Sequence, residues 1–181
     1  MIFSMVFTLS NCKKETSTPI NNTPTGGLKD ADGNVYTTVT IGKQVWLKQS
    51  LKTTKYKNGD PIPVVSDNTA YSALTTGAVN NPENDATLVE PYGKTYNYFA
   101  VVDPRGLCPD GFHVPNDADW DELLTTLGGA SIAGGKMKEV GTIHWDSPNS
   151  SATNSSGFTG LAAGFRALDG KYMHFGLSNY F

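Results

Sequence analysis

The sequence predicts a loop-rich α+β domain, and three observations support this. The 181 residues include 19 Gly and 10 Pro at an apolar content of 38%, which favours short strands and turns over a helical bundle. Two runs rich in β-branched and aromatic residues, 35–41 and 44–47, are typical of strands. Only one segment, residues 116–127, shows sustained helical periodicity. A chain of this length suits one domain with a tail.

The first predicted element is a hairpin made by the runs VYTTVTI and QVWL. They are separated by Gly42-Lys43, and a two-residue Gly-X connection signals a type II′ turn. In that register Val39 lies opposite Trp46, with Val35 and Ile41 on the same face. A Trp and β-branched residues on one face indicate core, so we expect Trp46 to be structural.

The clear helix is NDADWDELLTTL, residues 116–127. Asn116 can serve as its N-cap, and Asp119 three residues later completes a variant capping box. Gly128-Gly129 ends the helix. The apolar stripe that faces the core follows the i, i+3, i+4, i+7 pattern and consists of Trp120, Leu123, Leu124 and Leu127. Asn116, Asp119 and Trp120 are therefore expected to be structural residues.

The remaining segments contain shorter predicted elements. Residues 55–90 are polar and rich in turn residues, which is typical of a functional or variable loop. The aromatic-rich run at 92–103 contains a helical turn expected at 97–101, and its rings either pack in the core or stack on sugars. A second helical turn is expected in 133–145. Two short strands are expected on either side of the turn at 168–170.

Charge and hydropathy exclude two classes of partner. The net charge is −3 and no basic run exceeds two residues, whereas nucleic acid binding needs a concentrated positive face. No stretch reaches the roughly eighteen apolar residues of a membrane span. We expect neither nucleic acid binding nor a transmembrane helix.

The N-terminal run MIFSMVFTLSNC looks like a bacterial lipoprotein signal. In that class the leader, here residues 1–11, is cut before the cysteine, and the thiol of Cys12 takes a diacylglycerol. Residues 12–29 then read as a disordered tether, because they are polar and lack apolar periodicity. The alternative is a frayed terminus with an incidental cysteine. The lipoprotein hypothesis predicts a lipid-anchored protein of the outer membrane, and it leaves Cys108 without a partner in the chain.

The sequence offers few candidates for catalysis. Cys108 and His113 invite a Cys–His nucleophile, but no third orienting group is evident, and half of a disulfide is the better interpretation. The segments GGASIAGGK and GFTGLAAG match neither a P-loop nor a dinucleotide-binding fingerprint. No catalytic residue and no cofactor are expected.

Metal sites are equally poorly supported. The spacing of His113, His144 and His174 contains no His-x-x-x-His pair. The segment DADGN lacks the Gly and Glu that an EF-hand loop needs at its sixth and twelfth positions. NNPEND, residues 80–85, has oxygen ligands suited to Ca²⁺, but an ordinary polar loop looks the same. No metal is expected, and ligand-binding residues are not identifiable.

Five segments in order resemble the Fibrobacter succinogenes major paralogous domain family over residues 30–181. They are IGKQVWLKQSL, YGKTYNYFAV, LCPDGFHVPNDADWDELLTTLGG, AGGKMK and GFTGLAAGFRALDGKY. The run GFHVPNDADW also resembles a segment of the formylglycine-generating-enzyme group. That resemblance implies a C-type-lectin-like fold.

The chain departs from the family after Asn179-Tyr180-Phe181. Family members continue through further strands to a terminal Arg-Cys-Val run, so the resemblance implies a chain truncated at its C-terminus. It further implies that Cys108 is half of a disulfide with that terminal cysteine. A C-type-lectin-like fold pairs its first and last strands, so the edge of the hairpin at 35–47 is expected to be uncovered.

These inferences predict a cell-envelope lipoprotein with a non-catalytic binding or adhesion module. Its ligand would be a glycan or an envelope protein, and the membrane partner would be reached through the lipid anchor. One alternative is an enzyme related to the formylglycine-generating group, whose cysteine-based copper site this sequence lacks. The other is a nonfunctional truncated paralogue.

Overall fold

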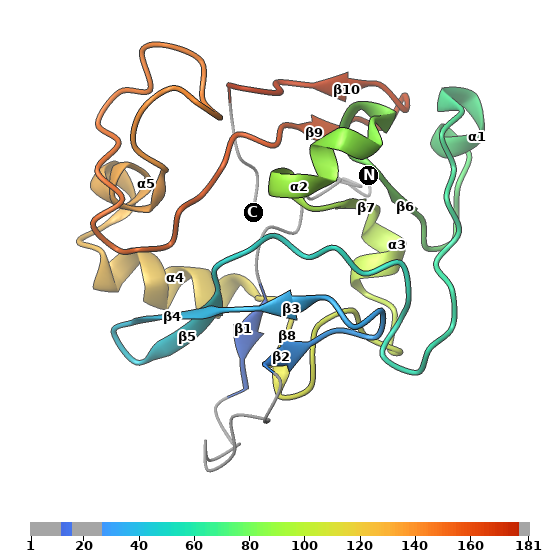
Figure 1. Cartoon of the computed structure of the whole chain (residues 1–181), viewed down its shortest axis with the longest axis horizontal. Helices are drawn as coiled ribbons and strands as arrows, with labels where there is room; N and C mark the ends of the chain where they lie inside the picture. The colour runs from blue at the N-terminus through green and yellow to red at the C-terminus, as the bar shows by residue number, and fades with distance from the viewer. Residues whose placement is uncertain (1–11, 16–26, 178–181) are drawn as a thin grey trace.

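The computed structural model describes residues 12–15 and 27–177. Its largest sheet has four antiparallel strands in the order β4-β5-β1-β8 and lies at the bottom of Figure 1. The strands are β4 (Thr38–Ile41), β5 (Gln44–Leu47), β1 (Lys13–Lys14) and β8 (Phe112–His113). The sheet therefore joins segments from opposite halves of the chain.

Among the described residues there are also three two-stranded antiparallel pairs. They are β2 (Leu28–Lys29) with β3 (Val35–Tyr36), β6 (Val79–Asn80) with β7 (Thr95–Tyr96), and β9 (Phe165–Arg166) with β10 (Tyr172–Met173). The β9–β10 pair lies at the top of Figure 1, far from the four-stranded sheet. The molecule is thus built from small sheets joined by long connections.

Most of the helices are short. They are α1 (Asn68–Ser72), η1 (Pro82–Asn84), η2 (Ala86–Leu88), α2 (Val89–Tyr92), α3 (Tyr98–Val101), α4 (Asp117–Thr126) and α5 (Ala130–Met137). The capping box predicted for α4 is present, because Asn116 accepts from the Asp119 N–H and Asp119 accepts from the Asn116 N–H. The Asn97 side chain caps α3 by accepting from the Ala100 N–H, and this helix confirms the turn expected at 97–101.

Two large apolar clusters hold these elements together. One surrounds Cys12 and Cys108 and includes the fully buried Leu47, Leu51 and Tyr96. The other surrounds Trp46, where α4 packs on the sheet. There the Trp46 and Trp120 rings lie 4.8 Å apart, and Phe158 contacts both. The expected core roles of Trp46 and Trp120 agree with this packing.

The predicted hairpin is correct in register but wrong at its outer end. Val39 pairs with Trp46, and Gly42 has a φ of 60°, as primed turns require. However, the strand breaks at Thr37, whose N–H donates to the side chain of Gln49. Before the break, the alternation of buried and exposed side chains is the reverse of that in β4. Tyr36 is therefore buried and Val35 is 53% exposed. Val35 therefore does not belong to the core face.

The tether expected at residues 12–29 is also wrong in part. Residues 12–15 contain β1, which pairs with both β5 and β8, and residues 28–29 form β2. The hairpin at 35–47, whose edge was expected to be uncovered, is covered by β1 on the β5 side, while β4 lies at the edge of the sheet among the described residues. The expected signal segment, residues 1–11, lies outside the described residues.

Other expectations are met more closely. Helices and small sheets occur together, as predicted for an α+β domain. The turn at 168–170 joins β9 and β10. Residues 130–137 form an eight-residue helix that begins earlier than the expected turn. None of the helices in the described ranges has the length and apolar character needed to cross a bilayer.

Candidate functional site

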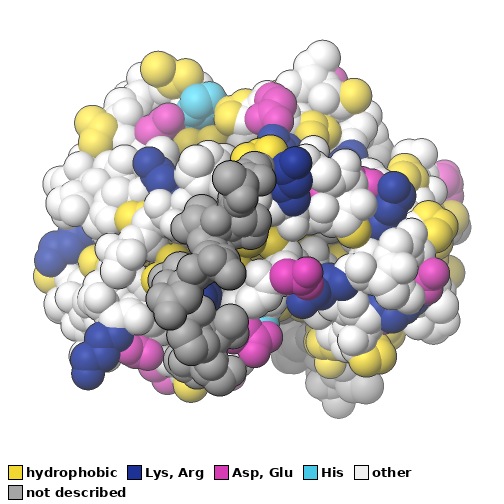
Figure 2. Space-filling model, turned by 60° about the horizontal axis from the view of Figure 1, so that its bottom comes forward, with side chains coloured by type: hydrophobic (Ala, Val, Ile, Leu, Met, Phe, Trp, Pro, Cys, Tyr) yellow, Lys and Arg dark blue, Asp and Glu magenta, His cyan; other side chains and the backbone are white. Residues whose placement is uncertain are grey.

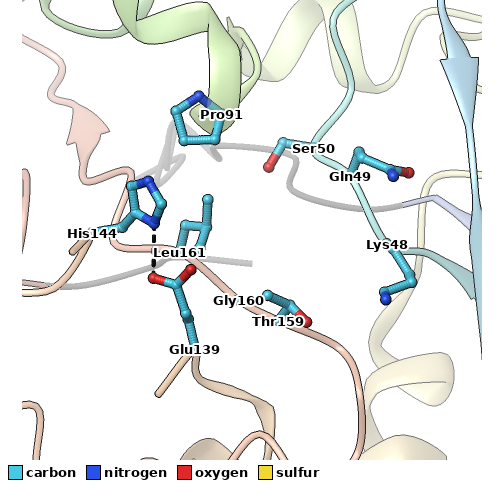
Figure 3. A pocket seen from close by; sticks show the side chains of 9 residues that line it. All are labelled: Lys48, Gln49, Ser50, Pro91, Glu139, His144, Thr159, Gly160 and Leu161. Atoms are coloured by element: carbon cyan, nitrogen blue, oxygen red, sulfur yellow. Dashed lines mark hydrogen bonds and ion pairs between the residues drawn. The ribbon is translucent and has the colours of Figure 1, made fainter. Parts of the chain in front are cut away.

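A pocket of about 250 Å³ lies between three segments that are far apart in the sequence (Figure 3). One wall follows β5, the second comes from the end of α2, and the third comes from the connections after α5. The lining residues are Lys48, Gln49, Ser50, Pro91, Glu139, His144, Thr159, Gly160 and Leu161.

The side chain of His144 is fixed from two directions. Its Nδ1 lies 2.8 Å from Glu139 Oε2, which leaves Nε2 for other partners. The ring of Tyr92 meets the imidazole edge-on, with centroids 5.4 Å apart. Burial raises the pKa of the Tyr92 hydroxyl, and the nearby carboxylates of Glu139 and Asp146 raise it further, so Tyr92 stays neutral beside the pair.

Several polar groups of the lining already have partners. The Gln49 side-chain amide bonds the N–H and hydroxyl of Thr37. The Thr159 hydroxyl accepts from Asn154 at 3.0 Å. The Gly160 carbonyl accepts from Trp145 Nε1 at 2.9 Å. These groups give the pocket its shape and have little capacity left for a ligand.

Four polar groups of the lining make no hydrogen bond within the described ranges. They are the ammonium of Lys48, the hydroxyl of Ser50, Oε1 of Glu139 and Nε2 of His144. Figure 3 shows Lys48 on one side of the pocket and the His144–Glu139 pair on the other. Pro91 and Leu161 add apolar surface between them. The pocket therefore offers donors, acceptors and an apolar contact to a small polar molecule.

Asp119, expected to be a capping residue, is also the centre of a charged cluster. Its carboxylate accepts from Lys13 Nζ at 2.5 Å, from His113 Nε2 at 2.9 Å and from the Asn116 N–H at 3.0 Å. Burial alone would raise the pKa of Asp119, but these hydrogen bonds outweigh burial and hold it below its usual value. His113 is thus tied to a structural carboxylate rather than to Cys108.

The two cysteines form one disulfide, which corrects both expectations about them. Cys12 and Cys108 are bonded across 96 positions of sequence, and both are buried. The prediction that Cys108 lacks a partner in the chain is wrong. The lipid expected on Cys12 is incompatible with this bond, because thioether lipidation needs the same sulfur. The partner of Cys108 is Cys12, not a terminal cysteine.

The structure adds nothing in favour of a metal or nucleic acid. Within the described residues, no group of three or more His, Cys, Asp or Glu side chains is placed to hold a metal. In the NNPEND segment, Asn80 accepts from the Val65 N–H and Asn81 from Lys94 Nζ, so these oxygens are engaged. On the face drawn in Figure 2, acidic and basic side chains are interspersed and form no basic patch.

Two structural residues were missed by sequence reasoning. Lys13 is buried at 4% exposure against Asp119, although its segment looked like a polar tether. Arg166 is fully buried, and its guanidinium donates to the carbonyls of Gly170, Val65 and Ser66. A lone Arg inside an apolar strand was a usable signal for the second. The pocket residues had no sequence signal at all, since they lie in unrelated connections.

Comparisons with known proteins identify a family. Searches against curated proteins and against solved structures found no match. The chain matches the Fibrobacter succinogenes major domain (Fib_succ_major) over residues 39–181, which is most of its length. The chain therefore belongs to the Fibrobacter succinogenes major domain family.

Proposed function

We propose that this protein is a binding module that acts outside the cytoplasm and holds a saccharide in the pocket beside His144. The observation that carries the proposal is a set of four polar groups on facing walls of that pocket that have no hydrogen-bond partner among the residues that the structure describes. Sugar hydroxyls both donate and accept hydrogen bonds, which suits the mixture of Lys48, Ser50, Glu139 and His144. Pro91 and Leu161 suit the apolar face of a sugar ring.

The size of the pocket favours a small ligand. Its volume of about 250 Å³ lies below the range of roughly 300–1,000 Å³ typical of drug-sized ligands, so one or two sugar rings suit it better than a folded partner. We further propose that the fold is C-type-lectin-like. The sheet that joins β1 from the N-terminal part to β8 supports that proposal.

The disulfide supports a location in the cell envelope. Disulfides persist in oxidising compartments such as the bacterial periplasm and the cell surface, and they are rare in the cytosol. The Cys12–Cys108 bond is buried and joins the central strand β1 to the turn before β8. A membrane anchor through Cys12 is not part of the proposal, because that sulfur is engaged.

The enzymatic alternative has less support. An enzyme related to the formylglycine-generating group would need a cysteine-based copper site. The sequence has two cysteines, and they are bonded to each other. A nonfunctional paralogue remains the outcome that the binding experiment would reveal.

A glycan array probed with the full, oxidised chain tests the proposal. The wild-type protein should bind at least one saccharide class, and His144→Ala should abolish that signal because it removes Nε2 and releases Glu139. Ser50→Ala should weaken binding, whereas Ser131→Ala, an exposed serine on α5, should not. Binding by wild type that His144→Ala leaves intact, or no binding to any glycan, would contradict the proposal.

A further inference from the structure

We infer that the pocket selects saccharides that carry a carboxylate, such as uronic acids, and that Lys48 is the residue that recognises the charge. This inference rests on the proposed saccharide-binding function and goes further by naming the ligand class. Neutral saccharides would satisfy the hydroxyl-binding groups of the pocket, but they would leave the Lys48 ammonium without an ionic partner.

The charges around the pocket lead to this conclusion. The carboxylate of Glu139 is engaged through Oε2 with His144. Lys52, four residues after Lys48, is paired with Glu90, the neighbour of Pro91. The ammonium of Lys48 has no ion pair or hydrogen bond in the part of the chain that the structure describes. Of the charged side chains in the lining, Lys48 is therefore the one available to an anion.

The position of Lys48 also sets the direction in which a ligand would lie. Figure 3 shows Lys48 across the pocket from the His144–Glu139 pair. A carboxylate at the Lys48 side gains a charge-assisted hydrogen bond, and the ring then lies toward Pro91 and Leu161. In the reverse direction the carboxylate would face Glu139, which repels it. Hydroxyls at the far end would instead reach Glu139 Oε1 and His144 Nε2.

An acidic peptide could present the same carboxylate, but the pocket suits it less well. Peptides are recognised in extended grooves or along sheet edges through their main-chain groups. Here the backbone carbonyl of Gly160 already accepts from Trp145 Nε1 and from the Glu139 N–H. The available partners are side-chain groups around a compact space, which matches a hydroxyl-rich ring.

Calorimetric titration with two matched probes tests the inference. Galacturonic acid and galactose, each a single sugar ring, differ chiefly in the one carboxylate. We expect the full, oxidised chain to bind the acidic probe about tenfold more tightly, as one charge-assisted hydrogen bond would give. Lys48→Gln should remove this preference, because it should weaken binding of the acidic probe far more than binding of the neutral one. Lys43→Gln, an exposed lysine at the far end of β5 in the Gly42-Lys43 turn, should preserve the preference.

Two further readouts sharpen the test. Raising the salt concentration should lower the affinity for the acidic probe and leave the affinity for the neutral probe unchanged. The reason is that Lys48 is exposed, so salt screens its charge. Glu139→Gln should raise the affinity for the acidic probe, because it removes a negative charge from the pocket.

Several results would overturn the inference. Equal affinity of the wild-type protein for both probes would show that Lys48 does not recognise the carboxylate. An equal loss of affinity for both probes with Lys48→Gln would show the same. Displacement of the acidic probe by an acidic peptide of similar affinity would show that the pocket is not built for saccharides. A wild-type protein that binds the neutral probe and shows no preference for the acidic one would overturn this inference alone. Absence of wild-type binding to either probe and to the glycan array would overturn the proposed function as well.

Discussion

Asp119 shows how one side chain serves both local and distant structure. It caps α4 through the Asn116 N–H and neutralises Lys13, which is 106 positions away in sequence. Its carboxylate is 9% exposed and the Lys13 side chain is 5% exposed, so both charges are largely removed from water. A buried pair of this kind tolerates loss of one member poorly, because the other charge is left without a partner.

We therefore expect Asp119→Asn to lower the free energy of unfolding by about 3–5 kcal/mol at neutral pH. The pKa of Asp119 is depressed in the folded state, so its contribution is present above the usual carboxyl pKa of about 4 and is lost as the pH falls through the lowered value. The difference from wild type should shrink below about pH 4. Urea unfolding between pH 2 and 8 measures this.

Asp117→Asn is the matched control, because Asp117 is an exposed carboxylate in the same helical turn. It should change stability by no more than about 0.5 kcal/mol. Equal effects of the two substitutions would mean that the buried pair with Lys13 contributes nothing specific.

Arg166 is stabilised without a carboxylate. Its guanidinium lies 3.8 Å from the Tyr71 ring centroid and donates to backbone carbonyls of β9–β10 and of the segment before α1. Burial raises the pKa of Tyr71 to about 12, although Arg166 acts to lower it. We expect Arg166→Lys to cost about 2–4 kcal/mol in thermal or urea unfolding, since an ammonium cannot reproduce the planar fork.

Arg105→Lys provides the comparison for Arg166. Arg105 is exposed, lies over the Tyr56 ring and pairs with Asp103 and Asp60 at the surface. Its replacement should leave stability nearly unchanged, because exposed ion pairs contribute little. A loss as large as that of Arg166→Lys would show that burial of the guanidinium is not what matters.

At the scale of helices and strands, an element was predictable where the residues that determine it lie close together in the sequence. Capping residues, turn glycines and apolar periodicity lie within a few residues of one another, which is why α4, α3 and the β4–β5 register followed from the sequence. The break at Thr37 did not, because there the Thr37 N–H donates to the side chain of Gln49 across the hairpin, and that side chain donates back to the Thr37 hydroxyl. The strand β1 was missed because its two residues are too few to show a periodicity.

Gly93, at the end of α2, controls the packing of two pocket walls. Its φ is 77°, and a Cβ there would lie 2.4 Å from Ser50 Cβ and 2.8 Å from the Leu51 carbonyl. We expect Gly93→Ala to destabilise the protein by about 2–4 kcal/mol and to weaken saccharide binding by displacing Ser50. Thermal unfolding and the glycan array measure the two effects.

Gly59→Ala separates strain from crowding. Gly59 also has a positive φ, 91°, but an added Cβ would meet no atom within 4 Å. Its substitution should cost only the conformational penalty of about 1 kcal/mol and leave binding intact. If both variants lose the same stability, the close contact of Gly93 with Ser50 is not important.

At the scale of the whole molecule, the pocket is a product of tertiary structure. Lys48, Pro91 and His144 come from three separate segments of the chain, and the spacing between them has no pattern that a sequence could reveal. The same is true of the cysteines, whose pairing depends on β1 entering the sheet between β5 and β8. The N-terminal sequence resembled a lipidation signal because that signal is short, whereas the disulfide is a property of the fold.

The disulfide closes a loop of 96 positions and fixes the central strand of the main sheet. In the chain-entropy account a loop of that length contributes about 4–5 kcal/mol, so Cys12→Ser with Cys108→Ser should lower the free energy of unfolding by that amount. Amide exchange should then rise at Lys13 and Lys14, because β1 loses its covalent tie to the turn before β8.

Mass spectrometry of the protein recovered from the envelope of its own host should find Cys12 linked to Cys108, with no diacylglycerol on Cys12. A lipidated Cys12 with a free Cys108 would contradict the pairing, and in that case the double substitution should leave the unfolding free energy of the lipid-free domain unchanged.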